Sequence, residues 1–514
     1  MPPRNPLEIP GILALIGAQI TLFECRPHFF EGYFFRPKDL LSCCLVSYFW
    51  HRTLLPVLWR CYNEDEMSWV PRSVLDQYSQ YYVYYQDVMI TCAKTVLPCR
   101  NLRIMTLHVD PQLNKQQESG QSSVSPFGLV DSNPGLTSLT LFGTWRMSAT
   151  LTSFDISHCS NLCKLWLCSF QSQPQDFGRL FVPEVTKRLT HLSLVSIHGR
   201  CDPSFLRTVC FPSMVQLYID IGDAIQPGLE ELVAFCPRLE RLIVRAHTRC
   251  RLDRLTKLLQ ENRIRLKSLH LLSSWIQDSK IDETNNDPND DNATSAPEDY
   301  GVTELIRNCD GLCELTINAS NLGIAQAVVR HHRATLEQFS VTVVATEEDL
   351  INYSEEEYNH GQARAAAQRA SFLIELLTCF PRLKILKFWD TKNMIDGASM
   401  IALLTAQPWE SNSLESLELS EALGFAPAPA HRSFRVDENH LWEVRERQTQ
   451  SRMINDPLEA TLLAHLFQHV SLTSRAPRLK EILLGSARYI KTQYTDPVCT
   501  LHRLFQRSFE SLLF

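Results

Sequence analysis

The chain has 514 residues, of which 44% are apolar and 21% charged, proportions typical of a folded globular protein. Its 50 basic and 57 acidic residues give a formal net charge of −7, which disfavours a general affinity for nucleic-acid phosphates. No apolar run reaches the roughly 18 residues that a membrane-spanning helix needs. We therefore expect neither nucleic acid nor a membrane as a partner.

Cysteine is frequent, and its 17 copies are an odd number scattered through apolar segments. Buried free thiols in a reducing compartment account for this pattern best, so we expect a location in the cytoplasm, the nucleus or both. The pairs Cys159–Cys163 and Cys309–Cys313 have the spacing of metal ligands, but neither belongs to a four-ligand zinc pattern. We interpret both pairs as packing within a repeat and expect no metal.

Residues 1–62 predict a small helical module. Apolar residues from Ile9 to Ile20 recur at helical spacing, a second helix is expected from Lys38 to Val46, and a third from Trp50 to Leu58. Three short helices bury a very small core. Such a module usually needs support from a partner or from the domain that follows.

The same segment resembles an F-box, as found in fungal-type F-box proteins with C-terminal leucine-rich repeats. Its middle carries the family's Val-Ser-x-x-Trp run at residues 46–50, and its end carries the Leu-Trp pair at residues 58–59. Its opening matches the usual Leu-Pro-x-Glu-Ile-Leu run at positions 6, 8 and 9, with asparagine and proline in place of leucine at positions 5 and 10. The segment 23–37 is longer and more aromatic than the family's usual helix connection.

The resemblance implies that the module docks on the Skp adaptor of a cullin–RING ubiquitin ligase. Contacts of F-boxes with that adaptor are mainly apolar, and burial of apolar area contributes about 25 cal/mol per Å2. The alternative is an ordinary helical cap, because terminal repeats of an array need capping. The residues expected to contact the adaptor are Pro6, Ile9, Ile12, Leu13, Ile16, Leu40, Leu41, Cys44, Val46, Trp50, Leu54, Leu58 and Trp59.

Residues 63–100 are expected to connect this module to the rest of the chain. They contain a tyrosine-rich run from Tyr78 to Tyr85. We interpret the run as a packed connector, with an aromatic contact surface as the alternative.

From about residue 101 onwards one phrase recurs about every 25 residues: a leucine, two variable residues, a leucine, one variable residue and a third apolar residue. Each copy predicts a short strand whose leucines point inward and whose intervening residues point to the opposite face. The copies begin at Leu102, Leu136, Leu162, Leu189, Met214, Leu239, Leu266, Leu312, Leu336, Leu383, Leu414 and Leu479.

Between the copies lie apolar segments at helical spacing, several of which end in Pro-Arg-Leu, as at residues 237–239 and 381–383. One strand and one helix per repeat resemble a leucine-rich-repeat horseshoe. We therefore predict an α/β solenoid over residues 101–514, with parallel strands on the concave face and helices on the convex face. The family's asparagine ladder is missing, so the turns must satisfy their backbone groups differently. Insertions interrupt the period at about 277–300, 346–370 and 422–457.

The strand face of a repeat array is the usual recognition surface. Tryptophan, tyrosine and arginine dominate interface energetics, and several of them occupy outward strand positions here. Because the charges in this set are mixed, the sign of the partner is not predictable. The residues expected to bind a protein target are Trp166, Tyr218, Arg241, Arg245, His270, Lys387 and Trp389.

The sequence lacks a Walker loop and the Gly-x-Gly-x-x-Gly, His-Glu-x-x-His and Gly-x-Ser-x-Gly motifs. The pair His331–His332 has no ligand-spaced acid or cysteine, and we interpret it as a surface helix end. We therefore expect a non-catalytic protein without a cofactor: the substrate-recognition subunit of a Skp–cullin–F-box (SCF) ubiquitin ligase. It would bind the Skp adaptor, a cullin through that adaptor, and an unidentified protein substrate. The alternatives are a non-ligase leucine-rich-repeat scaffold or inhibitor, and a hydrolase hidden in the C-terminal region.

Overall fold

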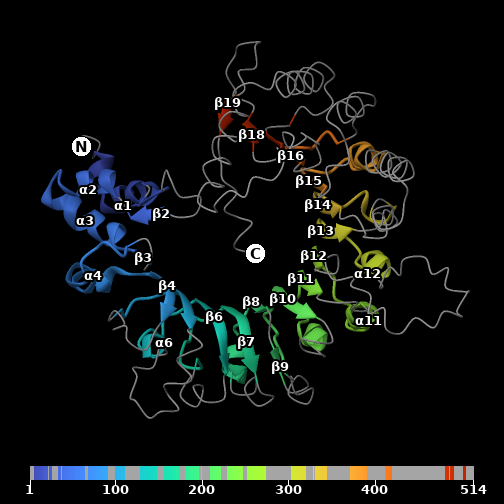
Figure 1. The fold of residues 1–514 in the computed structure, drawn as a ribbon, viewed down its shortest axis with the longest axis horizontal. Coiled ribbons are helices and arrows are strands. Elements are labelled where there is room, and N and C mark those ends of the chain that lie inside the picture. Colours follow the sequence, from blue (N-terminus) through green and yellow to red (C-terminus); the bar gives the residue numbers. More distant parts are fainter. Residues whose placement is uncertain are drawn as a thin grey trace, which may run out of the picture. The chain divides into compact units, whose positions relative to one another are not determined.

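The computed structural model divides into two compact units, unit 1 over Met1–Leu239 and unit 2 over Glu240–Phe514. Figure 1 shows helices near the N-terminus followed by a succession of strands. The structure describes residues 5–20, 22–25, 33–35, 37–63, 67–90, 99–109, 128–146, 156–172, 180–195, 198–199, 209–221, 229–246, 252–273, 302–319, 328, 330–343, 371–390, 411–419, 478, 481–484, 487–490 and 502–504.

Unit 1 begins with a short 3-10 helix, η1 (Pro6–Glu8), and three α-helices where the sequence predicts them: α1 (Pro10–Gln19), α2 (Lys38–Cys44) and α3 (Tyr48–Leu58). Proline at the first position of α1 costs no hydrogen bond, because that N–H has no intrahelical partner. The hydroxyl of Ser47 accepts a hydrogen bond from the backbone N–H of Trp50 at 3.2 Å. The Val-Ser-x-x-Trp run therefore starts α3 with a serine N-cap.

The three helices pack around a small apolar core. Leu13, Leu40, Leu54 and Leu58 are each at most 2% exposed. Gly17 lets α1 approach α3 closely, because a Cβ atom there would lie 2.5 Å from Cδ2 of Leu54. The long connection between α1 and α2 carries an antiparallel hairpin of β1 (Phe23–Cys25) and β2 (Tyr33–Phe35).

A parallel sheet follows in unit 1, with the strands paired in the order β3-β4-β5-β6-β7-β8-β10. The strands are β3 (Cys61–Asn63), β4 (Tyr84–Ile90), β5 (Ile104–Val109), β6 (Ser138–Arg146), β7 (Lys164–Ser172), β8 (His191–Val195), β9 (His198–Gly199, beside β7) and β10 (Gln216–Ile221). The helices are α4 (Arg72–Tyr78), η2 (Ser79–Tyr81), α6 (Gly128–Asp131), α9 (Pro183–Thr186) and η4 (Leu229–Phe235).

Unit 2 is built in the same way, with parallel pairing in the order β11-β12-β13-β14-β15-β16-β17. Two further strands, β18 (Ala487–Ile490) and β19 (His502–Leu504), continue it in antiparallel pairing. The parallel strands are β11 (Arg241–Ala246), β12 (Ser268–Ser273), β13 (Glu314–Ala319), β14 (Gln338–Val343), β15 (Ile385–Asp390), β16 (Ser416–Leu419) and β17 (Glu481–Leu484). Helices α11 (Asp253–Glu261), α12 (Val302–Asn308) and 371–379 precede β12, β13 and β15.

The leucine phrases fall on these parallel strands, which confirms the predicted repeat architecture. Within each unit the second leucines of successive phrases face one another in register, and each is at most 2% exposed. This inward row consists of Met105, Leu139, Leu165, Leu192 and Leu217 in unit 1, and of Leu242, Leu269, Leu315, Phe339, Leu386 and Leu417 in unit 2.

Strands β3 and β4 lie at and within the segment expected to be a connector, yet they belong to the parallel sheet. Tyr62 pairs in register with Tyr85, and Tyr85 pairs with Met105 of the inward row. Both tyrosines are buried and stack at a centroid distance of 4.9 Å. Aromatic side chains therefore take the place of leucines in the first two repeats.

The residue three positions before the first leucine closes the turn into many of the strands. Its carbonyl accepts the leucine N–H, and its side chain is small and buried in the examples that follow. Such bonds join Leu136 to Asn133 (3.1 Å), Leu162 to Cys159 (3.0 Å), Leu239 to Cys236 (3.1 Å) and Leu414 to Ser411 (3.1 Å). This turn therefore satisfies a backbone N–H at the entry to the strand.

Asn133 shows how one side chain fastens adjacent repeats. Its amide nitrogen donates to the carbonyl oxygens of Leu129 at 2.7 Å and Cys99 at 2.9 Å, and its amide oxygen accepts the N–H of Leu102 at 2.8 Å. Asn133 is 1% exposed, so all three bonds are shielded from water.

The three expected insertions lie outside the described residues. Among the described helices, none combines the length and the apolar character that a bilayer crossing requires.

Candidate functional site

The N-terminal helices expose an unusual amount of apolar side chain. Of the thirteen large apolar side chains that are exposed among the described residues, ten lie on or beside α1, α2 and α3. Exposed apolar groups are normal when scattered singly, but a concentration of them marks a contact site. We call this set the helical surface: Leu7, Ile9, Ile12, Leu15, Ile16, Leu41, Leu45, Val46, Tyr48 and Phe49.

The structure separates the predicted adaptor contacts into two groups. Pro6, Ile9, Ile12, Ile16, Leu41 and Val46 are exposed, and Trp50 is half-buried. The other six are buried and hold the helices together: Leu13, Leu40, Cys44, Leu54, Leu58 and Trp59. Trp59 stacks on Tyr78 at a centroid distance of 4.7 Å, so it joins the helices to the first repeats.

Sequence reasoning missed the most exposed members of the helical surface. Leu15 is 69% exposed, Tyr48 79% and Leu45 84%. A signal for them exists in the sequence, because residues 10–19 are apolar nearly all round the helix, and a helix of that kind must bury more than one face.

The strand face of unit 1 is largely uncharged and carries aromatic rings. Trp166 on β7, Ser193 on β8 and Tyr218 on β10 stand side by side in register. The ring of Trp166 lies 6.5 Å from that of Tyr218 and 6.5 Å from that of Phe142. Tyr218 is only 3% exposed and Trp166 is half-buried, so neither predicted target contact projects freely into solvent.

Nε1 of Trp166 and Oγ of Ser193 on this face are buried, and neither has a hydrogen-bond partner among the described residues. An unsatisfied buried donor costs about 1–3 kcal/mol. Such groups are rare in native proteins, and each one calls for an explanation.

The strand face of unit 2 is charged, and several of its charges pair with one another, although Nε of Arg241 is buried without a hydrogen-bond partner among the described residues. Nη2 of Arg241 lies 2.9 Å from Oε1 of Glu314, and Nε2 of His270 lies 3.2 Å from the same oxygen. Burial opposes ionisation of Glu314, but hydrogen bonds from His270 and Ser268 and the charge of Arg241 outweigh it and lower its pKa to about 2. Glu314 therefore remains a carboxylate at any physiological pH.

A second ion pair lies further along the same face. Nζ of Lys387 lies 3.3 Å from an oxygen of Glu418, whose side chain is 14% exposed. Arg245 is half-buried on β11, and the side chain of Trp389 lies outside the described residues. Of the predicted target contacts in unit 2, the structure thus brings Arg241 and His270 together.

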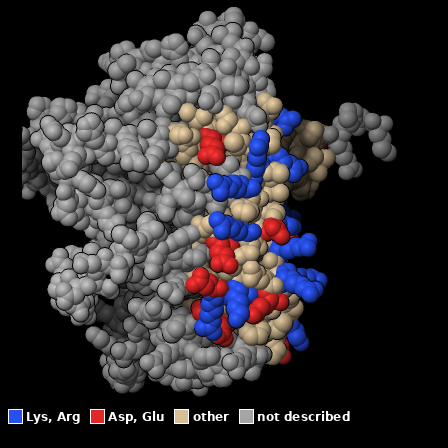
Figure 2. Space-filling view, turned by 90° about the vertical axis from the view of Figure 1, so that its right-hand side faces the viewer, with Lys and Arg blue, Asp and Glu red and all other residues tan. Residues whose placement is uncertain are grey.

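The start of the unit 2 strands carries further pairs between neighbouring repeats. Lys267 contacts Glu240 at 2.8 Å, and Lys384 contacts Glu337 at 2.6 Å. Figure 2 shows Lys and Arg interspersed with Asp and Glu over the described residues of the face that it views, rather than a patch of one sign. Mixed charges of this kind do not favour a polyanion such as nucleic acid.

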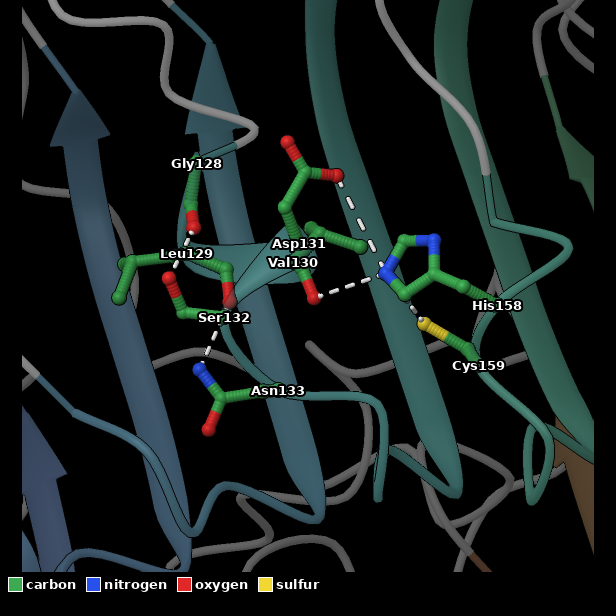
Figure 3. A network of polar contacts seen from close by, with 8 residues as sticks. All are labelled: Gly128, Leu129, Val130, Asp131, Ser132, Asn133, His158 and Cys159. Atoms are coloured by element: carbon green, nitrogen blue, oxygen red, sulfur yellow. Dashed lines mark hydrogen bonds and ion pairs between the residues drawn. The ribbon is translucent and has the colours of Figure 1, made fainter.

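A cysteine, a histidine and an aspartate meet in unit 1, and their geometry bears on catalysis (Figure 3). Nε2 of His158 lies 3.6 Å from Sγ of Cys159, 3.9 Å from Oδ1 of Asp131 and 3.3 Å from the carbonyl oxygen of Val130. A nucleophilic triad needs the thiol on one ring nitrogen and the acid on the other. Here all three groups approach the same nitrogen, so the arrangement is not a Cys-His-Asp triad.

The buried cysteines behave as packing residues. Burial raises the pKa of Cys99 to about 12 and that of Cys309 to about 12. Both thiols therefore stay protonated at neutral pH, a form unsuited to metal binding or nucleophilic attack. Among the described residues, no group of three or more His, Cys, Asp or Glu could hold a metal ion.

The interpretation of His331–His332 as a surface helix end is wrong for the second histidine. His332 is 1% exposed, and its Nε2 lies 2.8 Å from the carbonyl oxygen of Ile306 in the neighbouring repeat. Burial lowers the pKa of His332, so the ring is neutral and donates through Nε2–H. His332 is thus a structural link between repeats.

Comparison with known proteins adds little to this picture. No family model and no curated protein matches the chain. A solved structure similar to part of it is the leucine-rich-repeat ectodomain of the plant membrane receptor kinase GASSHO1/SCHENGEN3 from Arabidopsis thaliana. That match has 12% sequence identity and a TM-score of 0.19, and it covers 66% of this chain and 44% of the ectodomain. The repeat fold assigned here rests on the strand register and its leucines.

Proposed function

We propose that this protein is a non-catalytic substrate-recognition subunit of an SCF-type ubiquitin ligase. The helical surface would bind the Skp adaptor and, through it, a cullin, while the strand faces would hold a protein target. The observation that carries the proposal is the concentration of exposed apolar side chains on the helices whose sequence resembles an F-box. The function then consists of bringing target and ligase together, because proximity lowers the entropic cost of the transfer step.

The helical surface has the chemistry of a protein interface. Leu15 and Ile16 extend from α1, and Leu41, Leu45 and Val46 line α2 and its C-terminal end. Full burial of one such side chain stabilises a complex by about 1.5–3 kcal/mol, so a few of them suffice for stable binding. The buried residues beneath hold α1, α2 and α3 in place and would contribute indirectly.

The proposal is tested by co-elution of the purified full chain with purified Skp adaptor. Leu45→Asp and Leu15→Asp place a charge at highly exposed apolar positions, so the variants should fold normally and lose the adaptor. Trp69→Asp is the matched control, because Trp69 is 61% exposed but lies outside the helical surface. Co-elution that survives both leucine substitutions would show that the assigned surface is wrong.

A cell-based comparison separates the ligase subunit from a repeat scaffold. We expect Leu15→Asp combined with Leu45→Asp to abolish function if the chain works through the adaptor, because both positions are exposed and neither lies in the repeats. Full function of this double variant would favour a scaffold or inhibitor that acts through its strand faces alone.

A further inference from the structure

Three residues in register on neighbouring strands of unit 1 form a small cluster. Ser193 on β8 lies between Trp166 on β7 and Tyr218 on β10, in the part of unit 1 where these strands follow one another (Figure 1). Strands two places apart are separated by roughly 10 Å. The ring centroids of Trp166 and Tyr218 are nevertheless 6.5 Å apart, so the two rings converge over the small serine.

The cluster holds hydrogen-bond donors without an acceptor among the residues that the structure describes. Oγ of Ser193 and Nε1 of Trp166 are buried and have no partner there, and Ser193 is 8% exposed as a whole. The indole N–H can only donate. The group missing from the site is therefore an acceptor that lies between β7 and β8.

A positive charge stands beside these donors. Lys164 precedes Trp166 by two residues on β7, so both side chains lie on the same face. Lys164 is exposed and has no ion pair with any residue that the structure describes. Asp220 on β10 also lies on this face, buried and about as far from Ser193 as Lys164 is, roughly 8 Å, but Asp220 is not free, because it has an interaction of its own.

We propose that Trp166, Ser193 and Lys164 form a binding site for the carboxylate of an aspartate or glutamate on the protein target. Two donors and one ammonium group match an acceptor-only monoanion in both hydrogen bonding and charge. A phosphate dianion would leave one of its charges unpaired here. The rings of Trp166 and Tyr218 must part to admit the carboxylate. The proposal rests on the proposed function, in which the strand faces hold the target.

Selection from a phage-displayed library of random dodecapeptides against the full chain tests the proposal. The selected peptides should share an acidic residue, and its change to the matching amide should weaken binding about tenfold or more, as expected for hydrogen bonds to a charged group. Trp166→Phe, Ser193→Ala and Lys164→Gln should each weaken binding comparably. Lys187→Gln and Trp69→Phe alter an exposed lysine and an exposed tryptophan elsewhere in unit 1 and should have no effect.

A spectroscopic measurement distinguishes direct contact from a structural effect. With 15N-labelled tryptophan, the indole N–H signal that disappears in Trp166→Phe should move downfield when the acidic peptide is added, and stay in place with the amide peptide. The proposal is overturned if the selected peptides need no acidic residue, or if their binding is indifferent to all three substitutions, as it would be if a trapped water filled the site. Co-elution of the same variants with the Skp adaptor reports separately on the proposed function.

Discussion

The strand faces of the two units share one architecture and differ in how their polar groups are satisfied. On unit 2, Arg241 and His270 pair with Glu314 across three strands, and Lys387 pairs with Glu418, although Nε of Arg241 is buried without a hydrogen-bond partner among the described residues. On unit 1, Nε1 of Trp166 and Oγ of Ser193 are buried, and neither has a partner in the part of the chain that the structure describes. Ion pairs within a face contribute to stability, whereas unsatisfied donors lower stability unless a partner fills them. The difference is one of degree: the first face pairs its charges across strands, whereas the two donors of the second are those for which we propose an acceptor on the target.

The largest loss of stability is expected from substitution of Asn133, whose side chain links adjacent repeats of unit 1. Asn133→Ala leaves two carbonyl oxygens and one N–H without their bonds, so it should lower the free energy of unfolding by about 3 kcal/mol. Ser411→Ala, at the equivalent position in unit 2, removes only hydroxyl bonds to Leu377 and Phe380 and should cost about half as much. Urea unfolding gives the free energy of unfolding of both variants, and hydrogen exchange locates the change. Equal losses of free energy would show that the turn, and not the side chain, provides the stability.

Substitution within the charged cluster of unit 2, formed by Arg241, His270 and Glu314, should cause the next largest loss of stability. Glu314→Gln removes the carboxylate that Arg241 and His270 share, and should lower the free energy of unfolding by about 1–2 kcal/mol, because the group is only partly buried. The folded-state pKa of Glu314, about 2, lies below its unfolded value near 4.5. Its contribution is therefore complete above pH 4.5 and is lost as the pH falls towards 2.

Acid unfolding curves check this contribution. The wild-type chain should lose stability between pH 4.5 and 2 more steeply than Glu314→Gln, because the variant has no proton to take up at this position. If the stability of the two proteins fell equally steeply with pH, the carboxylate of Glu314 would not be held in the ionised form by its neighbours.

Removal of the orphan hydroxyl of unit 1 should act in the opposite direction. Ser193→Ala eliminates a buried polar group without a partner, so it should raise the free energy of unfolding by about 1 kcal/mol while it weakens target binding. Thermal unfolding of the full chain measures the gain. A destabilised variant would mean that the hydroxyl already has a partner in the free protein.

The smallest contribution to stability is expected from the Lys387–Glu418 ion pair on the strand face of unit 2. A double-mutant cycle with Lys387→Gln and Glu418→Gln should give a coupling energy of about 0.5 kcal/mol, because Lys387 is 41% exposed. The coupling energy should fall in 1 M salt, where the Debye screening length is only about 3 Å. A coupling energy above about 2 kcal/mol would mean that this pair stabilises the fold as strongly as the Glu314 cluster does.

Much of the fold could be predicted from the sequence, because a leucine phrase specifies both a strand and its inward side. Strands β3 and β4 were missed because Tyr62 and Tyr85 stand where the phrase has leucines. The cluster of unit 2 could not be predicted, because Arg241 and Glu314 are 73 residues apart and meet only through the register of three strands. On the N-terminal helices, periodicity alone did not separate the inward Leu40 from the outward Leu45, since both belong to one apolar segment.

We propose that the N-terminal helices, and not the strand faces, bind the Skp adaptor. The decisive measurement is hydrogen exchange of the full chain with and without purified adaptor. We expect slower exchange at residues 7–16 and 41–49 when the adaptor is added, and unchanged exchange in β7, β8 and β10. Protection of those strands with none in the helices would contradict the claim, as would the absence of any change at adaptor concentrations far above those that saturate an F-box protein.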